Sequence, residues 1–132
     1  MKDNYRRTKT TVSLLRYHFV FCPYRRRKVF LIPGVEDRVK ELVTGLCDKH
    51  GYEILAMECH IDHVHLFLSA PPDKSPAEIM ASLKGPSSRI MRQEFKALSG
   101  MKCLWTRSYF VSTAGNVSSE TIRRYVETQK TR

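Results

Sequence analysis

The sequence predicts one α+β domain in which four antiparallel strands and two helices follow the order βαββαβ. Three observations lead to this fold class. The 132 residues suit a single compact domain. A composition with 42% hydrophobic and 27% charged residues is globular. The hydrophobic spacing switches between alternation and the helical period of about 3.6 residues. The element order is that of the ferredoxin-like split-βαβ sandwich, here followed by one more helix.

In the first half of the chain the pattern is strand, helix, strand, strand. The first ten residues are expected to form a basic N-terminal arm. The first strand is predicted from β-branched and aromatic side chains, and the helix from an apolar stripe that Gly51 ends with a left-handed cap. The predicted segments are a strand over 11–23, a basic loop over 24–28, a helix over 35–50, and strands over 52–59 and 64–70 around a turn at Ile61–Asp62.

In the second half the pattern is helix, strand, helix. Ser75 is the expected N-cap of a helix that begins at Pro76, and Gly85–Pro86 is expected to kink or restart it. Residues 103–113 predict a strand with an interruption near Arg107, and Gly115–Asn116 predicts a turn. Ser118 or Ser119 then caps the last helix. In this fold, both long helices cover one face of the sheet and leave the other face for a polymer or a second subunit.

The charge balance indicates a polyanionic partner. Twenty-three Lys and Arg face thirteen Asp and Glu, which gives a net charge of +10 and a pI near 9.7. Nucleic acid is the commonest partner of such a surface, and selection for solubility is the simpler alternative. Segments long enough to span a membrane are not expected. The four cysteines form no CxxC pair, which favours reduced thiols and a cytoplasmic location.

The segment HIDHVHLFLS at residues 60–69 carries a candidate metal site. Side chains alternate along a strand, so His63 and His65 share one face while Val64, Leu66 and Leu68 face the core. Two neighbouring imidazoles can bind one metal ion, and two exposed surface histidines are the alternative. Asp62 is either an auxiliary ligand or a turn residue. Cys59 and His60 alternate with the pair, so one straight strand cannot bring all of them to the same ion.

The last helix carries a candidate nucleophile. Tyr125 and Gln129 are four residues apart and therefore stack on one helical face. Taken alone, Tyr125 is better explained as a core aromatic of an amphipathic helix. Taken with the histidine pair, a phenol can attack phosphorus in a phosphodiester that a divalent ion polarises. Gln129 then offers the ion a neutral oxygen, and the basic surface holds the DNA strand.

These residues resemble the single-tyrosine HUH transposases of the insertion-sequence 200/605 type, transposase A-like enzymes of bacteria and archaea. HVH at His63 to His65 resembles their His-hydrophobic-His motif, and YVETQ at Tyr125 to Gln129 resembles their tyrosine helix. SLKGPSSRIMRQEF (82–95) and LWTRSYFVSTAG (104–115) are also similar to family blocks. The four blocks in this order make the resemblance specific.

The resemblance implies a single HUH domain over residues 1–132 and a specific chemistry. Tyr125 is the catalytic residue that forms a 5′-phosphotyrosine link and releases a 3′-hydroxyl, which later rejoins DNA. His63, His65 and Gln129 bind Mg²⁺ or Mn²⁺. The partners are single-stranded DNA with hairpins and a second copy of the chain, in a prokaryotic cytoplasm. Weaker DNA-contact candidates are the basic residues Arg6, Arg7, Arg25, Arg26, Arg27, Lys84, Arg89 and Arg92.

Two alternatives remain open from the sequence. A ferredoxin-like sheet with basic loops is also typical of single-stranded nucleic-acid-binding modules without catalysis. That alternative gives no reason for Tyr125, Gln129 and the histidine pair to occur together. A domesticated relative that cuts repeated palindromes for its host is the second alternative, and it shares the chemistry but differs in its target.

Overall fold

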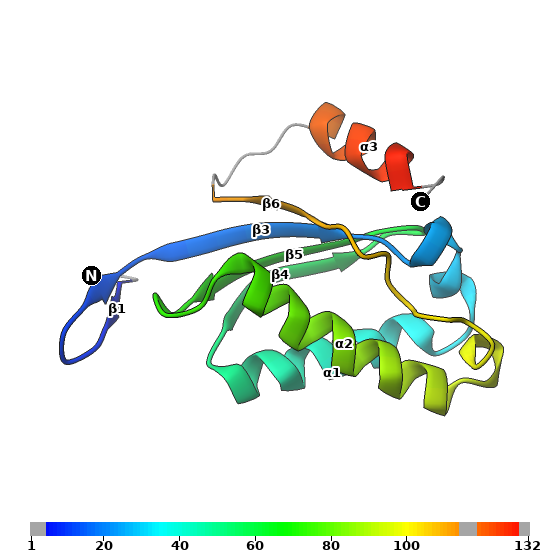
Figure 1. Cartoon of the computed structure of the whole chain (residues 1–132), viewed down its shortest axis with the longest axis horizontal. Helices are drawn as coiled ribbons and strands as arrows, with labels where there is room; N and C mark the ends of the chain where they lie inside the picture. Colours follow the sequence, from blue (N-terminus) through cyan, green and yellow to red (C-terminus); the bar gives the residue numbers. More distant parts are fainter. Residues whose placement is uncertain (1–4, 114–118, 130–132) are drawn as a thin grey trace.

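The computed structural model describes residues 5–113 and 119–129 and confirms the α+β class (Figure 1). Its main sheet has four antiparallel strands in the order β4-β5-β3-β6. This is the arrangement in which each helix connects two strands that flank a third. The strands are β3 (Leu15–Phe21), β4 (Glu53–Cys59), β5 (Val64–Ala70) and β6 (Phe110–Ser112).

Two long helices cover one face of this sheet, and a third lies over the other face (Figure 1). α1 (Val35–His50) and α2 (Pro76–Glu94) pack side by side below the strands, while α3 (Ser119–Thr128) lies above β3 and β6. Short 3₁₀ turns occupy Tyr24–Arg26, Val29–Leu31 and Lys96–Leu98. In the described part of the chain, we find no helix with the length and apolar character needed to cross a membrane.

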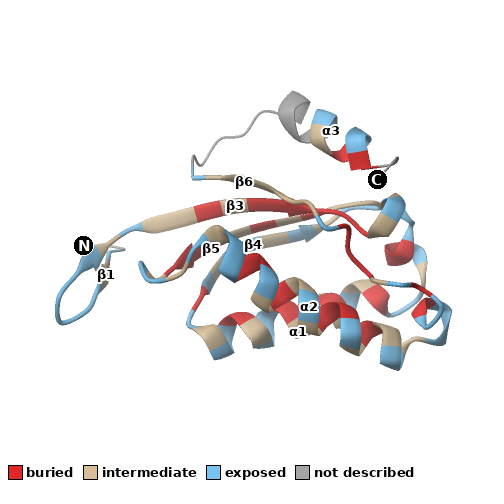
Figure 2. Ribbon diagram, viewed as in Figure 1, coloured by how far each residue is buried: buried red, intermediate tan, exposed pale blue. Residues whose placement is uncertain are grey.

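The core lies between the sheet and the pair α1 and α2 (Figure 2). Alternation along β5 buries Val64, Leu66 and Leu68 in this core, as the sequence predicts. On β3 the odd-numbered residues face the core, and Val20 and Cys22 face the opposite side. There they form a small second cluster with Val126 of α3. α3 is thus attached by a contact that is separate from the main core.

The ends of the first two helices match their sequence signals. α1 ends at His50, and Gly51 follows in the left-handed conformation (φ 78°), where glycine avoids the steric cost of a Cβ atom. Ser75 caps α2 by accepting a hydrogen bond from the N–H of Glu78, whose carboxylate accepts from the N–H of Ser75.

The restart expected at Gly85–Pro86 does not occur, because α2 continues through Pro86 to Glu94. A proline inside a helix removes one backbone hydrogen bond and costs about 3 kcal/mol. Buried residues on both sides of Pro86, among them Leu83, Ser87 and Met91, hold the helix against the core. Tertiary packing therefore outweighs the local penalty.

The strand predicted over 103–113 is much shorter in the structure, where only Phe110–Ser112 forms β6. Upstream, Trp105 makes one isolated bridge to Pro23. The carbonyls of Thr106, Arg107 and Ser108 instead accept hydrogen bonds from the Lys84 ammonium group. A side chain of α2 therefore takes the acceptors that a continuous strand would need.

Arg6 and Arg7, within the expected basic arm, form β1 (Arg6–Arg7), which pairs with β2 (Val12–Ser13) in a two-stranded sheet. The expected turn at Gly115–Asn116 and the expected cap Ser118 lie outside the described residues, as does the side chain of Ser119.

Candidate active site and metal centre

Three histidines meet where β4 turns into β5. The N–H of His60 donates to the carbonyl of His63 at 2.8 Å and closes the turn between the strands. Ligand nitrogens of His60, His63 and His65 lie within 4.8 Å of one another. His60 joins the pair because the chain folds back at this turn instead of continuing as a straight strand, and Cys59 is not part of the group. His60 is the most exposed member, so it is the least constrained of the three.

The pair His63 and His65 has the geometry of a metal-binding site. Their Nε2 atoms face each other at 3.1 Å. Two nitrogens about 2.1 Å from one ion and at a right angle to each other lie about 3.0 Å apart. The separation of the two nitrogens therefore matches the distance between two imidazole ligands of one divalent ion. Imidazole nitrogens suit Mn²⁺ and Zn²⁺ better than Mg²⁺, for which oxygen ligands are the usual choice.

Asp62 orients the first of these imidazoles. His63 Nδ1 donates to Asp62 Oδ1 at 2.9 Å, which places the lone pair of a neutral His63 on Nε2, the atom that faces His65. Arg26 donates through Nε and an Nη to Asp62 Oδ2 at 3.0 and 2.6 Å. Burial by itself raises the pKa of Asp62, but the hydrogen bonds from His63 and Arg26 outweigh it and lower the pKa. Both carboxylate oxygens are thus engaged, one by His63 and the other by Arg26.

The loop that supplies Arg26 has an unusual backbone. Arg25 and Arg26 both have a φ of 55°, a conformation that side chains with a Cβ atom adopt at a steric cost. The pairing with Asp62 fixes Arg26 in this position. The neighbouring Arg25 and Arg27 are exposed. The basic loop therefore contributes one structural guanidinium and two that point to the surface.

His65 is neutral over the whole physiological range. Burial, followed by the nearby imidazoles of His63, His60 and His18, lowers its pKa to about 4. Its Nδ1 lies 3.1 Å from Nε2 of His18 on β3, and the two rings stack 5.3 Å apart between centroids. Burial also lowers the pKa of His18. A neutral imidazole is the form that binds metal, so His65 would not have to lose a proton to serve as a ligand.

A cavity of about 440 Å³ separates the histidines from α3. It lies against the open face of the sheet, under the helix that carries the candidate nucleophile. The sheet side is lined by the three histidines with Asp62 and Arg26, and the helix side by Arg123, Val126 and Glu127.

Tyr125 and Gln129 share one face of α3, as the sequence predicts, and both contact Ser108. Ser108 Oγ donates to Gln129 Oε1 at 2.6 Å and lies 3.0 Å from the Tyr125 hydroxyl. Because the one proton of Ser108 goes to Gln129, the phenol donates its own proton to Ser108 Oγ. Gln129 is 1% exposed and its amide also donates to the Tyr125 carbonyl at 3.3 Å. The structure thus brings the two histidines together, and it docks Tyr125 and Gln129 on a separate segment.

Lys84 of α2 binds the backbone of residues 106–108, the segment that includes Ser108. Its ammonium group donates to the carbonyls of residues 106–108 at 2.6, 3.3 and 3.1 Å. Burial lowers the pKa of Lys84 to about 8. Because the ammonium group makes these three hydrogen bonds, its protons are engaged inside the protein. Among the other basic candidates, Arg92 donates to the carbonyls of Ser88 and Met101, and Arg6 to that of Ser69. Arg7 and Arg89 are exposed.

Sequence reasoning missed four residues of this site: His18, His60, Arg26 as the partner of Asp62, and Ser108. His60 was signalled only by the turn residues that follow it. The other three depend on contacts between segments far apart in the chain.

Comparison with known proteins gives one consistent family. The chain matches the model of the family described as "Transposase IS200 like" over residues 11–129. It is 33% identical over 121 residues to the ISDra2 transposase TnpA of Deinococcus radiodurans, with 89% of this chain and 86% of the relative covered. It is 35% identical over 118 residues to the transposase for insertion sequence element IS200 of Salmonella typhimurium, with 86% and 76% covered.

Solved structures agree. The crystal structure of a candidate transposase from Deinococcus radiodurans superposes with a TM-score of 0.85 at 31% identity, over 94% of this chain and 97% of that one. A REP-associated tyrosine transposase bound to a REP hairpin gives a TM-score of 0.55 at 16% identity, over 96% and 69%. The second likeness concerns the fold alone.

Proposed function

This chain belongs to the family of IS200-like transposases, whose members are DNA-cleaving enzymes, and on this premise we propose which residues perform the cleavage. Tyr125 forms the covalent link to single-stranded DNA, at a site where His63 and His65 hold a divalent metal ion. The observation that carries this proposal is the 3.1 Å separation of the two Nε2 atoms, with Asp62 behind one of them.

The donor set supports Mg²⁺ or Mn²⁺ as the ion, since two imidazoles leave several positions for oxygen ligands from phosphate and water. When bound, a divalent ion here supplies a Lewis acid for the scissile phosphodiester. Gln129 is proposed as a further, neutral oxygen ligand. Its side-chain oxygen now accepts from Ser108, so α3 has to shift before Gln129 can serve in this way. Asp62 acts through His63 and is not itself a proposed ligand.

In the proposed reaction the Tyr125 oxygen attacks the phosphorus. The bond from phosphorus to the 3′-side oxygen breaks, and the phenol's proton ends on the released 3′-hydroxyl. The products are a 5′-phosphotyrosine link and a free 3′-end. Rejoining is the reverse attack by a 3′-hydroxyl, which restores the phenol. One phosphodiester is exchanged for another at each step, so no nucleotide hydrolysis is required.

The nucleophile has to reach the histidines from its docked position. The wall of α3 that faces the cavity carries Arg123, Val126 and Glu127, while the Tyr125 hydroxyl binds Ser108. We propose that α3 leaves Ser108 during the reaction, or that a second copy of the chain supplies Tyr125. In the second case the chain works as a homodimer.

The proposed substrate is single-stranded DNA with a hairpin. A net charge of +10 supports binding to a polyanion, and exposed Arg25 and Arg27 flank Arg26, which pairs with Asp62. The REP-associated relative was solved with a DNA hairpin. The exposed arginines, including Arg7 and Arg89, are proposed phosphate contacts. We propose that residues 1–132 form a single domain. We also propose that it acts on DNA in a prokaryotic cytoplasm.

The test is adduct formation on single-stranded hairpin DNA with Mn²⁺, read on a denaturing gel. The parent should give a covalent protein–DNA band, and Tyr125→Phe should give none because it lacks the attacking oxygen. Tyr5→Phe is the matched control, since Tyr5 is an exposed phenol far along the chain, and it should leave the band intact. His63→Ala should remove the band as well. A band that survives Tyr125→Phe assigns the nucleophile elsewhere.

A further inference from the structure

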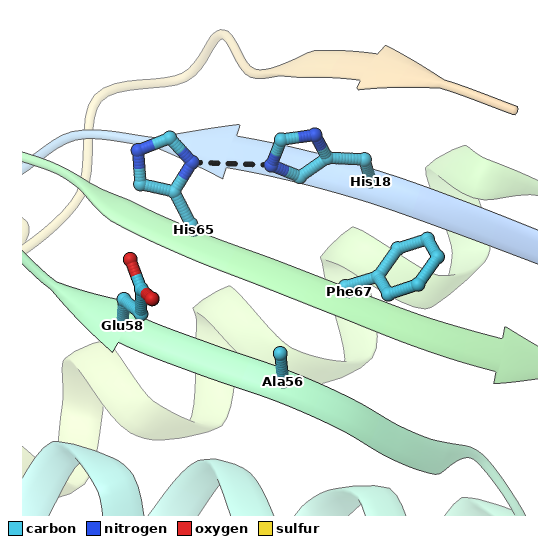
Figure 3. A pocket seen from close by; sticks show the side chains of 5 residues that line it. All are labelled: His18, Ala56, Glu58, His65 and Phe67. Atoms are coloured by element: carbon cyan, nitrogen blue, oxygen red, sulfur yellow. Dashed lines mark hydrogen bonds between the residues drawn. The ribbon is translucent and has the colours of Figure 1, made fainter. Parts of the chain in front are cut away.

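A third imidazole contacts the metal site from behind. His18 lies on β3 and His65 on the neighbouring β5, where His65 pairs with Val20 and Phe67 pairs with His18. The two histidines are thus diagonal neighbours on the face opposite α1 and α2. Figure 3 shows their rings side by side, with His18 Nε2 3.1 Å from His65 Nδ1.

The position of the single proton on a neutral imidazole decides whether the contact between His18 and His65 can support metal binding. A neutral imidazole carries one proton, on either Nδ1 or Nε2. His65 points its Nε2 at the metal position, facing His63 Nε2. To bind a metal there, His65 needs its proton on Nδ1, and a buried N–H needs an acceptor. The atom beside His65 Nδ1 is Nε2 of His18.

The arrangement mirrors the one behind the first ligand. Asp62 accepts the Nδ1 proton of His63 and so presents His63 Nε2. His18 is in the equivalent position behind His65, with an imidazole nitrogen in place of a carboxylate oxygen. The rings of His18 and Phe67 meet nearly at a right angle, at 85°, with centroids 6.3 Å apart. An open hollow of about 240 Å³ beside them is also lined by His65.

We propose that His18 is a positioning residue of the metal site: in the metal-bound state its Nε2 accepts the Nδ1 proton of His65 and holds His65 with Nε2 directed at the ion. The inference rests on the proposed metal site at His63 and His65. It assigns to β3 a part in the site, so the centre spans two strands and the turn between β4 and β5.

The first test measures the affinity of the full chain for Mn²⁺. As Mn²⁺ is titrated with the protein, binding is followed by the loss of the electron paramagnetic resonance signal of free Mn²⁺. His18→Phe keeps a ring of similar size but removes the acceptor, and it should weaken Mn²⁺ binding about tenfold or more. His18→Gln can place an amide oxygen near the position of Nε2 and should recover most of the loss. Phe67→Leu is the matched control, because it changes the packing on His18 and leaves the hydrogen bond in place.

The outcomes separate the two proposals. His63→Ala gives the reference for a lost site. If the parent takes up no more Mn²⁺ than His63→Ala does, the proposed metal site fails, and this inference fails with it. If the parent binds Mn²⁺ and His18→Phe binds it equally well, the metal site stands and the role of His18 is overturned. Equal losses in His18→Gln and His18→Phe, or an equal loss in Phe67→Leu, reduce His18 to a packing residue and also overturn it.

A second measurement uses the parent protein and so needs no variant. Imidazole ¹⁵N spectra of the parent loaded with Zn²⁺, a diamagnetic probe that binds imidazole well, report which ring nitrogen of each histidine is protonated. His18 should carry its proton on Nδ1 and have Nε2 free as an acceptor. A proton on His18 Nε2 in the loaded chain would leave the two nitrogens unable to share a hydrogen bond, and the proposal would be wrong.

Discussion

Ser108 is the residue whose removal tests how the nucleophile is held. Ser108→Ala deletes an oxygen that accepts from the Tyr125 hydroxyl at 3.0 Å and a proton donated to Gln129 at 2.6 Å. One net hydrogen bond contributes about 1 kcal/mol. Gln129 keeps a weaker contact with Thr106 at 3.4 Å, so the loss is about 1–2 kcal/mol for the docking of α3. That corresponds to an increase of roughly 5- to 30-fold in the undocked fraction.

Hydrogen exchange and single-turnover cleavage measure the two consequences of this change. Amides in the last turn of α3, near Gln129, should exchange faster by about the same factor. If undocking precedes attack, covalent adduct on hairpin DNA should form faster by up to that factor. Ser99→Ala is the control, because the hydroxyl of Ser99 donates only to the nearby carbonyl of Lys96. Faster exchange with slower adduct formation would refute the reasoning, since it would mean that the docked phenol is already the reactive one.

Three further predictions concern groups outside the docking contact. Asp62→Asn should weaken Mn²⁺ binding about tenfold, because His63 loses its carboxylate partner; Asp48→Asn, an exposed change on α1, should have no effect. Burial lowers the pKa of Lys84 to about 8, so between pH 8 and about 10 the unfolded chain binds more protons than the folded one. Urea unfolding should therefore show the parent gaining stability over Lys84→Met as the pH rises through this window; parallel pH profiles would contradict this. Ser75→Ala removes the capping box of α2 and should cost about 1 kcal/mol, seen as a melting temperature lower by about 3–5 °C, whereas Ser99→Ala should not lower it.

The parts of the fold that the sequence predicts well are those with local causes. The bounds of α1 follow from its apolar stripe and from Gly51, and the cap of α2 follows from Ser75 and Glu78. The core positions of β5 follow from alternation. In each case the residues that decide the structure lie within a few positions of the element they form.

The parts that sequence reasoning missed have causes far away in the chain. β-Branched and aromatic residues in 103–113 favour a strand, but Lys84, on another element, takes the carbonyls of residues 106–108. Gly85–Pro86 predicts a kink or a restart, and the restart does not occur because core packing holds α2 together. The contact of His18 with His65 depends on the register between β3 and β5, which the sequence of neither strand specifies.

The candidate site divides into two halves that differ in how firmly the fold holds them. His63 and His65 lie at the end of strands that are anchored in the main core. Asp62 contacts Nδ1 of His63, and His18 contacts Nδ1 of His65, so both imidazole rings are held in place. The nucleophile half is attached by a small separate cluster around Val126 and by the polar contacts of Ser108. A few kcal/mol can therefore move α3 without disturbing the core or the histidines. Such a division suits strand transfer, because the phosphate must be held in place while the tyrosine that carries the DNA approaches and leaves.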